Sequence, residues 1–157
     1  MSDTSEIYIS QSNNTVAKLP LVAAVVALAG LADAIYLTIK HYTGEAVPCS
    51  IVEGCEQVLT SSYAEIGGVP LAIFGAAAYF AAFSLAILAA FGNRLMWSLF
   101  GVQVTLMLIF TAWLVYLQAF VIEAFCQFCL LSAFVTTVLF IIFLASRFSR
   151  HCSNQIK

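Results

Sequence analysis

Four apolar runs, each long enough to cross a lipid bilayer, constrain the fold of this chain more than any other feature. They cover Leu19–Ile39, Val69–Phe91, Leu95–Ile122 and Cys126–Ala145. About 20 helical residues span a ~30 Å hydrocarbon core, and a helix satisfies its own backbone hydrogen bonds there. Only 9% of the residues are charged and 62% are hydrophobic, whereas a soluble domain carries about 25% charged residues. We therefore predict an all-α integral membrane protein, a four-helix transmembrane bundle.

The segments around these runs predict the rest of the organisation. Residues 1–17 are mostly polar and rich in Ser, Thr, Asn and Gln, which is typical of a disordered tail. Residues 18–146 are expected to form the membrane domain, and residues 41–68 within it form a long polar loop. Residues 147–157 are expected to form a second tail.

Two local features refine this outline. Pro20 falls in the first turn of the first predicted helix, where the missing N–H of proline costs nothing. In the polar loop, residues 55–63 are expected to make a short helix that lies on the membrane surface. Val58, Leu59 and Tyr63 would then share one side of that helix.

The number of crossings decides which cysteines share a side of the membrane. The polar loop and the start of the fourth run lie on the same side, so Cys49 and Cys55 face the same compartment as Cys126 and Cys129. The opposite side carries most of the basic residues, namely Lys18, Arg94, Arg147, Arg150 and Lys157. Positive charge marks the cytoplasmic side. Both tails are therefore predicted to be cytoplasmic and both cysteine pairs extracytoplasmic, where disulfides persist.

The motif Cys126-Gln127-Phe128-Cys129 opens the fourth run and predicts redox chemistry. Unpaired N–H groups and the positive end of the helix dipole stabilise a thiolate at a helix N-terminus. The thiolate is the species that attacks a disulfide or an oxidant. Phe125, Phe128 and Leu130 add apolar surface on which a lipid-soluble oxidant such as a quinone could dock.

The second pair, Cys49 and Cys55, lies in the polar loop with Gly54 beside it. A pair in a flexible loop can reach an incoming protein thiol on one side and Cys126 on the other. The two pairs together predict a relay that runs from a substrate dithiol through the loop pair and the membrane pair to an electron acceptor.

Other interpretations of the cysteines compete with a relay. They could form two structural disulfides. Four thiolates also suit zinc, although the gap between Cys49 and Cys55 is poor ligand spacing and an oxidising compartment disfavours such a site, so no metal is expected. Covalent haem is excluded, because Leu130 stands where the attachment motif needs His. Cys152, alone on the reducing side, is expected to have no role.

In this order and spacing, the residues resemble the vitamin K epoxide reductase (VKOR) family, in its bacterial-type disulfide-forming branch. The resemblance runs from about Gly30 to Ala145. Its elements are Gly30-Leu31 followed by Tyr36-Leu37, the loop Cys49 and Cys55, Ser61, Ile73-Phe74-Gly75, and the Cys126-x-x-Cys129 motif.

The resemblance implies a thiol:quinone oxidoreductase in a bacterial-type inner or cell membrane, with four helices around the quinone. The quinone would be of the ubiquinone, menaquinone or phylloquinone (vitamin K) type. Its expected contacts are Ser61, Leu71, Phe74 and Cys129.

The resemblance also implies an order for the four catalytic cysteines. Cys55 would meet the partner protein, and Cys49 would pass electrons to Cys126. Cys129 would lie nearest the quinone ring.

Some features depart from the family pattern. Leu71 stands where the animal enzyme has a quinone-contacting Asn, and Ala133 where it has a Tyr. Both differences argue for plain quinone reduction and against epoxide reduction. Epoxide reductase activity is kept as an alternative function. Many bacterial relatives carry a fused thioredoxin-like domain, and the sequence after Ser146 contains none. The partner is therefore expected to be a separate thioredoxin-fold (DsbA-like) thiol oxidase, and no nucleic acid is expected to bind.

Polar residues inside or beside the runs leave further alternatives open. Asp33 lies within the first run, and an intramembrane carboxylate is a functional candidate. It could handle protons or be a buried, hydrogen-bonded side chain. A small four-helix transporter that uses Asp33, or a structural subunit with two static disulfides, would be a protein of another class. Glu123 is expected to be solvated or to raise the thiol pKa of Cys126, and Gln118 to make an interhelical hydrogen bond.

Overall fold

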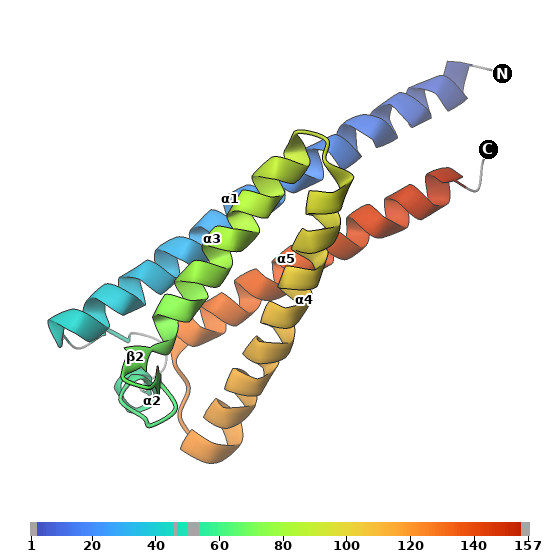
Figure 1. Cartoon of the computed structure of the whole chain (residues 1–157). Helices are drawn as coiled ribbons and strands as arrows, with labels where there is room; N and C mark the ends of the chain where they lie inside the picture. Colours follow the sequence, from blue (N-terminus) through green and yellow to red (C-terminus); the bar gives the residue numbers. More distant parts are fainter. Residues whose placement is uncertain (1–2, 46, 50–53, 155–157) are drawn as a thin grey trace.

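The computed structural model describes residues 3–45, 47–49 and 54–154, with side chains between residues 18 and 148. Its long helices are α1 (Asp3–Thr43), α3 (Leu71–Ala90), α4 (Arg94–Leu117) and α5 (Gln127–Asn154), which pack as one bundle (Figure 1). The described part of the chain contains four spans long and apolar enough to cross a membrane: Lys18–Thr43, Leu71–Ala90, Arg94–Ile122 and Gln127–Phe148. The predicted four-helix membrane bundle is confirmed.

Short elements make the connections at one end of the bundle. Helix α2 (Cys55–Leu59) precedes two antiparallel strands, β1 (Glu65–Ile66) and β2 (Val69–Pro70). The turn between the strands uses Gly67 and Gly68 with φ values of 62° and 82°, which glycine adopts at no steric cost. A π-helical turn, η1 (Gln118–Ile122), follows α4 directly.

Two helices differ in extent from the sequence-based prediction. Helix α1 begins at Asp3, so the segment predicted as a disordered tail continues the first helix, and Pro20 lies inside α1 rather than in its first turn. Adding residues to an existing helix costs far less than nucleating one. Helix α2 ends at Leu59, because the hydroxyls of Thr60 and Ser61 bond back to carbonyls of that helix at 2.6 and 2.7 Å.

Small residues allow α1 and α3 to pack closely. Ala23, Ala27, Ala82 and Ala86 are fully buried in the core. At Gly30, a Cβ atom would lie 2.4 Å from the ring of Tyr79, so only glycine fits there without a shift of that ring. Lipid gives helices no hydrophobic reason to associate, and close van der Waals packing of small residues takes its place.

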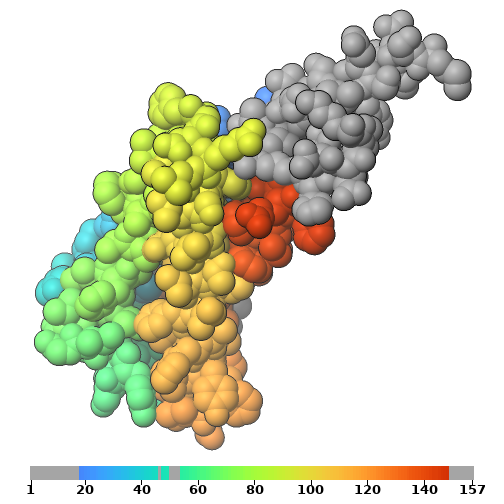
Figure 2. Space-filling view, turned by 45° about the vertical axis from the view of Figure 1, so that its right-hand side comes forward, coloured from blue at the N-terminus to red at the C-terminus, as the bar shows by residue number. Residues whose placement is uncertain are grey.

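Helix α4 is buried only along its N-terminal half. Trp97, Phe100 and Val104 are buried, and the indole N–H of Trp97 donates to the hydroxyl of Ser146 at 2.7 Å. Among the described residues of α4, none beyond Val104 is buried. Figure 1 shows α4 diverging from α3 towards its C-terminal end, and Figure 2 shows it along the outside of the bundle. The bundle is therefore tight at the end with the α3–α4 turn and more open at the end with the short elements.

Candidate functional site

The two cysteine pairs meet at the open end of the bundle. Cys49 and Cys55 are joined by a disulfide with a Cα–Cα distance of 6.2 Å, and Cys126 and Cys129 are free thiols. Cys55 and Cys126 are 2% and 0% exposed, and they belong to one buried cluster with Val58. The side chain of Cys152 lies outside the described residues. The fold thus brings together two pairs that are far apart in the sequence.

A glycine lets the loop pair approach the membrane pair. Gly54 immediately precedes Cys55, and a Cβ atom there would lie 2.7 Å from the carbonyl oxygen of Phe125 and 3.1 Å from the Cβ of Ala124. Any other residue would push the loop away from the segment that leads into Cys126. The side chain of Gln57 adds a hydrogen bond from Nε2 to the carbonyl oxygen of Ile122 at 3.4 Å.

Gln118 holds the segment that connects η1 to α5. Its side-chain oxygen accepts a hydrogen bond from the backbone N–H of Cys126 at 3.1 Å, and its carbonyl oxygen accepts one from Ala124 at 3.2 Å. Gln118 is 3% exposed. Glu123 is exposed and ends η1 with a left-handed backbone, φ 54°. Gln118 therefore bonds to the segment that leads into α5, and not across to another helix as predicted.

The surroundings of Cys126 favour its thiolate. A hydrogen bond from the Cys129 thiol is the main cause, and it lowers the pKa of Cys126 to about 7. Backbone N–H groups of Phe128 and Cys129, at the start of α5, lower this pKa further. Burial and the Asp33 carboxylate act in the opposite direction. A thiol with this pKa is substantially ionised at neutral pH and can act as a nucleophile.

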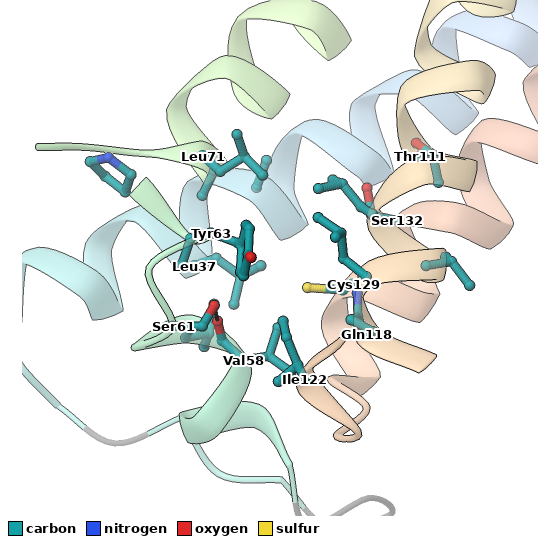
Figure 3. Close-up of a pocket in the computed structure, with 18 of the residues that line it drawn as sticks. Leu37, Val58, Ser61, Tyr63, Leu71, Thr111, Gln118, Ile122, Cys129 and Ser132 are labelled. Carbon is teal, nitrogen blue, oxygen red and sulfur yellow. Dashed lines mark hydrogen bonds between the residues drawn. The ribbon is translucent and has the colours of Figure 1, made fainter. Parts of the chain in front are cut away.

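A mainly apolar cavity of about 140 Å³ lies beside these cysteines. Helices α1, α4 and α5 and the segment from α2 to α3 form its walls (Figure 3). The sulfur of Cys129 points into it, and its polar lining includes Ser61, Gln118 and Ser132 (Figure 3). An apolar cavity with a few polar groups is typical of a site for a small organic molecule.

The predicted quinone contacts fall into two groups. Ser61, Leu71 and Cys129 line this cavity. Phe74 does not, because it lies one helical turn further along α3 and lines an adjoining cavity of about 240 Å³ beside Tyr79. Ser132 lines both cavities. The structure thus places three of the four predicted contacts around one space, and their role as quinone contacts stays a prediction.

Sequence reasoning missed some of the lining residues. Ser132 lies one turn after Cys129 on the same face of α5, a spacing that could have identified it. His41 lies two turns after Asp33 on the same face of α1, so the same spacing argument applies to it. Tyr63 was expected on one side of a surface helix with Val58 and Leu59, and all three line the cavity although α2 ends at Leu59. Gln118 was expected to make an interhelical hydrogen bond, and its bond to the backbone of Cys126 depends on the position of η1.

The site combines three features: the Cys126/Cys129 dithiol, the Cys49–Cys55 disulfide packed against it, and an apolar cavity beside the sulfur of Cys129. These features define a class of protein, the membrane-embedded thiol–disulfide oxidoreductases. A family model described as "Vitamin K epoxide reductase family" matches residues 21–144. The match covers most of the chain, and the protein belongs to this family, as the sequence motifs indicate. The family assigns it quinone-linked disulfide oxidoreductase activity.

The role of Gln118 can be tested by removing its acceptor. In Gln118→Leu, the buried N–H of Cys126 loses its partner, and we expect a destabilisation of about 1–3 kcal/mol. Thermal unfolding in detergent measures it. Gln103→Leu is the matched control, because it makes the same substitution in α4 at a half-buried position away from the cysteines, and we expect a change within about 0.5 kcal/mol. Equal losses in both variants would contradict this role.

The pKa of Cys126 can be tested by alkylation as a function of pH. We expect the rate at Cys126 to rise with pH and to reach half its maximum near pH 7, because the thiolate is the reactive form. Cys129→Ala removes the S–H donor, so the midpoint should move up towards the ordinary value of 9.0. Cys129→Ser keeps a donor and should move it less. Quantitative mass spectrometry of the Cys126 peptide measures the rate, and a midpoint that is the same in all three proteins would refute the assignment.

Proposed function

We propose that this protein is a disulfide-generating thiol:quinone oxidoreductase, which reoxidises a thioredoxin-fold partner and passes the electrons to a membrane quinone. One observation carries the proposal. Cys126 shares a buried cluster with Cys55, while its motif partner Cys129 lines the apolar cavity. The Cys126/Cys129 pair is thus in contact with a disulfide on one side and with a site for an apolar acceptor on the other.

The redox states of the two pairs fit one stage of this cycle. The loop pair is a disulfide and the membrane pair is reduced. In this state the loop pair can accept electrons from a partner, and the membrane pair can donate to a quinone. A quinone of higher potential drives the flow, since each ~30 mV supplies about 1.4 kcal/mol for a two-electron couple.

Exposure favours an order of the loop cysteines that is the reverse of the one implied by the resemblance. Cys55 is 2% exposed and lies in the cluster with Cys126, whereas Cys49 is half-buried at its edge. A partner thiolate would attack the Cys49 sulfur and release the Cys55 thiolate. Cys55 would then attack the Cys126 sulfur of the oxidised membrane pair and release Cys129 as a thiolate.

Two further exchanges complete the electron balance. The second thiol of the partner displaces Cys49 and leaves the partner as a disulfide. Cys49 then attacks Cys55 and re-forms the loop disulfide, which leaves Cys126 and Cys129 reduced. The partner has lost two electrons and two protons, and the membrane pair has gained them.

The mainly apolar lining of the cavity, with a few polar groups, suits an apolar acceptor such as a quinone. Leu71 lines the cavity and contributes apolar surface where the animal enzyme has an amide. Ala133, which is not among the lining residues, stands where that enzyme has a Tyr hydroxyl. These residues favour plain quinone reduction over epoxide reduction. The quinone is the oxidising substrate here, and Ser61, Gln118 and Ser132 are the polar groups that would orient it.

The charge distribution supports an extracytoplasmic position for the cysteine end and a cytoplasmic position for both termini. Figure 1 shows α2 at one end of the bundle and the α3–α4 turn with both chain ends at the other. The cysteine end carries Glu45, Glu56, Glu65 and Glu123, and the turn end carries Arg94 and Arg147. The Lys40 ammonium is paired with Glu45 at 2.6 Å. Cytoplasmic ends carry the excess of Lys and Arg.

Quinone turnover tests the proposed function. Purified protein is mixed with a reduced thioredoxin-fold oxidase and a quinone, and the absorbance of the quinone is followed. We expect one hydroquinone for each partner disulfide formed. Cys126→Ser and Cys129→Ser should show no turnover above background, because each removes half of the membrane pair. Cys152→Ser is the matched control and should be as active as the wild type. An inactive wild-type protein, or an active Cys129→Ser, would refute the proposal.

The order of the loop cysteines is tested by trapping. A partner that keeps only its attacking cysteine cannot resolve the mixed disulfide it forms, so the species accumulates. We expect peptide mapping to find the partner on Cys49, because Cys49 is the more exposed of the two. Cys49→Ser should abolish the species. A partner trapped on Cys55 would restore the order implied by the resemblance.

A further inference from the structure

One oxygen of the Asp33 carboxyl group stands out in the interior of the bundle. Among the described side chains, Asp33 Oδ2 is the buried polar atom that has no hydrogen-bond partner. Asp33 lies on α1 and lines the same cavity as Cys129 and Ser132. Buried polar atoms nearly always have partners, and an exception in a native structure points to a catalytic or ligand-binding role.

The packing of α1 directs Asp33 towards the cavity. Asp33, Leu37 and His41 are spaced by four residues and all line it, so they form one stripe along the helix. Ala34, beside Asp33, is buried against α3, where a Cβ atom at Gly75 would lie 3.8 Å from the Cβ of Ala34. This contact sets the rotation of α1 and therefore the face that carries the carboxyl group.

Asp33 is the carboxylic acid among the described residues that line the cavity. Asp33 interacts electrostatically with Cys126 and Cys129 on the α5 side and with Tyr79 on α3. The described cavity lining contributed by α4 is uncharged. The other ionisable residues of the lining are His41 and Tyr63.

The other ionisable side chains near the cavity either have partners of their own or lie away from the thiols. His41 lies about 12 Å from Asp33 along the helix, and its Nε2 is paired with Glu65 at 3.2 Å. Tyr63 belongs to the loop and is 52% exposed. The hydroxyl of Tyr79 is bonded to Ser132 and Thr136 at 2.8 and 2.9 Å.

We propose that Asp33 is a catalytic residue of the quinone step, the acid that hands one of the two required protons to a quinone carbonyl oxygen. The inference rests on the proposed function, which supplies the quinone. Reduction of a quinone takes up two electrons and two protons, and an apolar cavity offers few proton donors. A carboxyl group can donate a proton from one oxygen and regain one afterwards.

The electrons and protons of this step balance with the two cysteines, Asp33, the quinone and water. The Cys126–Cys129 S–S bond forms and its two electrons pass to the quinone, whose two carbonyl oxygens become hydroxyls. The thiol proton of Cys129 goes to Asp33, and the Asp33 proton goes to one quinone oxygen. The second oxygen takes up a proton from water, equal to the one that Cys126 releases when it ionises. Asp33 ends the cycle in the state in which it began.

A single-turnover experiment on the full chain tests the role of Asp33. Protein with a reduced membrane pair is mixed with a soluble quinone, and hydroquinone formation is followed. Asp33→Asn keeps the shape but cannot transfer a proton, so the rate constant should fall by about 10²–10⁴-fold while the quinone KM changes little. Asp33→Glu should recover part of the rate. Glu123→Gln removes a carboxylate that is exposed near Cys126 and should match the wild type.

The outcomes separate this inference from the function on which it rests. If the wild-type protein reduces no quinone, both the proposed function and the role of Asp33 are contradicted. An active wild type with an equally fast Asp33→Asn overturns the role of Asp33 alone, as does a variant that loses quinone affinity with its rate constant unchanged. Thiol exchange with the partner, measured without quinone, should be intact in Asp33→Asn.

A second measurement decides the case if Asp33→Asn does not fold. Dicyclohexylcarbodiimide, a lipid-soluble reagent, modifies carboxylic acids in apolar surroundings. In the wild-type protein it should label Asp33 and abolish quinone reduction, and added quinone should protect Asp33 from the label. Labelling of Asp33 that quinone does not slow, or full activity after complete labelling, would overturn the proposal.

Discussion

The architecture depends on one constraint: in lipid, every backbone N–H and C=O group needs a partner inside the protein. The four long helices satisfy it along their length, so irregular backbone is concentrated at the ends of the bundle. The connection from η1 to α5 is such a segment. In this segment, the backbone N–H of Ala124 donates to the carbonyl oxygen of Gln118, and the backbone N–H of Cys126 donates to the side-chain oxygen of Gln118. The same bonds fix the start of α5, where the redox motif lies.

The contrast between the two ends of the bundle creates the site. At one end, Trp97 and its bond to Ser146 hold α4 against α5. At the other end α4 diverges, and the cavity occupies the space between α1, α4, α5 and the loop segment before α3. The tight end gives rigidity, and the open end gives room for an apolar substrate next to Cys129. Small residues at the α1–α3 contact bring the carboxyl group of Asp33 into that space.

Much of the fold was predictable, because the lipid core of a membrane requires long apolar helices and such runs can be recognised in the sequence. The positions of the four spans follow from run length, and the shared end of the two cysteine pairs follows from the number of crossings. Helix ends were less predictable. Polar residues before Leu19 suggest a tail, yet α1 begins at Asp3. The loop helix is shorter than its apolar pattern indicates, because hydroxyls of Thr60 and Ser61 compete for its carbonyls.

The sequence by itself determined the class of chemistry: two cysteine pairs, an apolar chain and a crossing number that puts both pairs on one side. Only the tertiary structure decided which cysteine of the loop pair is buried against Cys126, that Phe74 lines a different cavity from Leu71, and that Asp33 lines the same cavity as Cys129. The physical reason is that these facts depend on the rotation and divergence of packed helices. Rotation is set by close contacts such as Gly30 against Tyr79 and Gly54 against Phe125, between residues far apart in the chain.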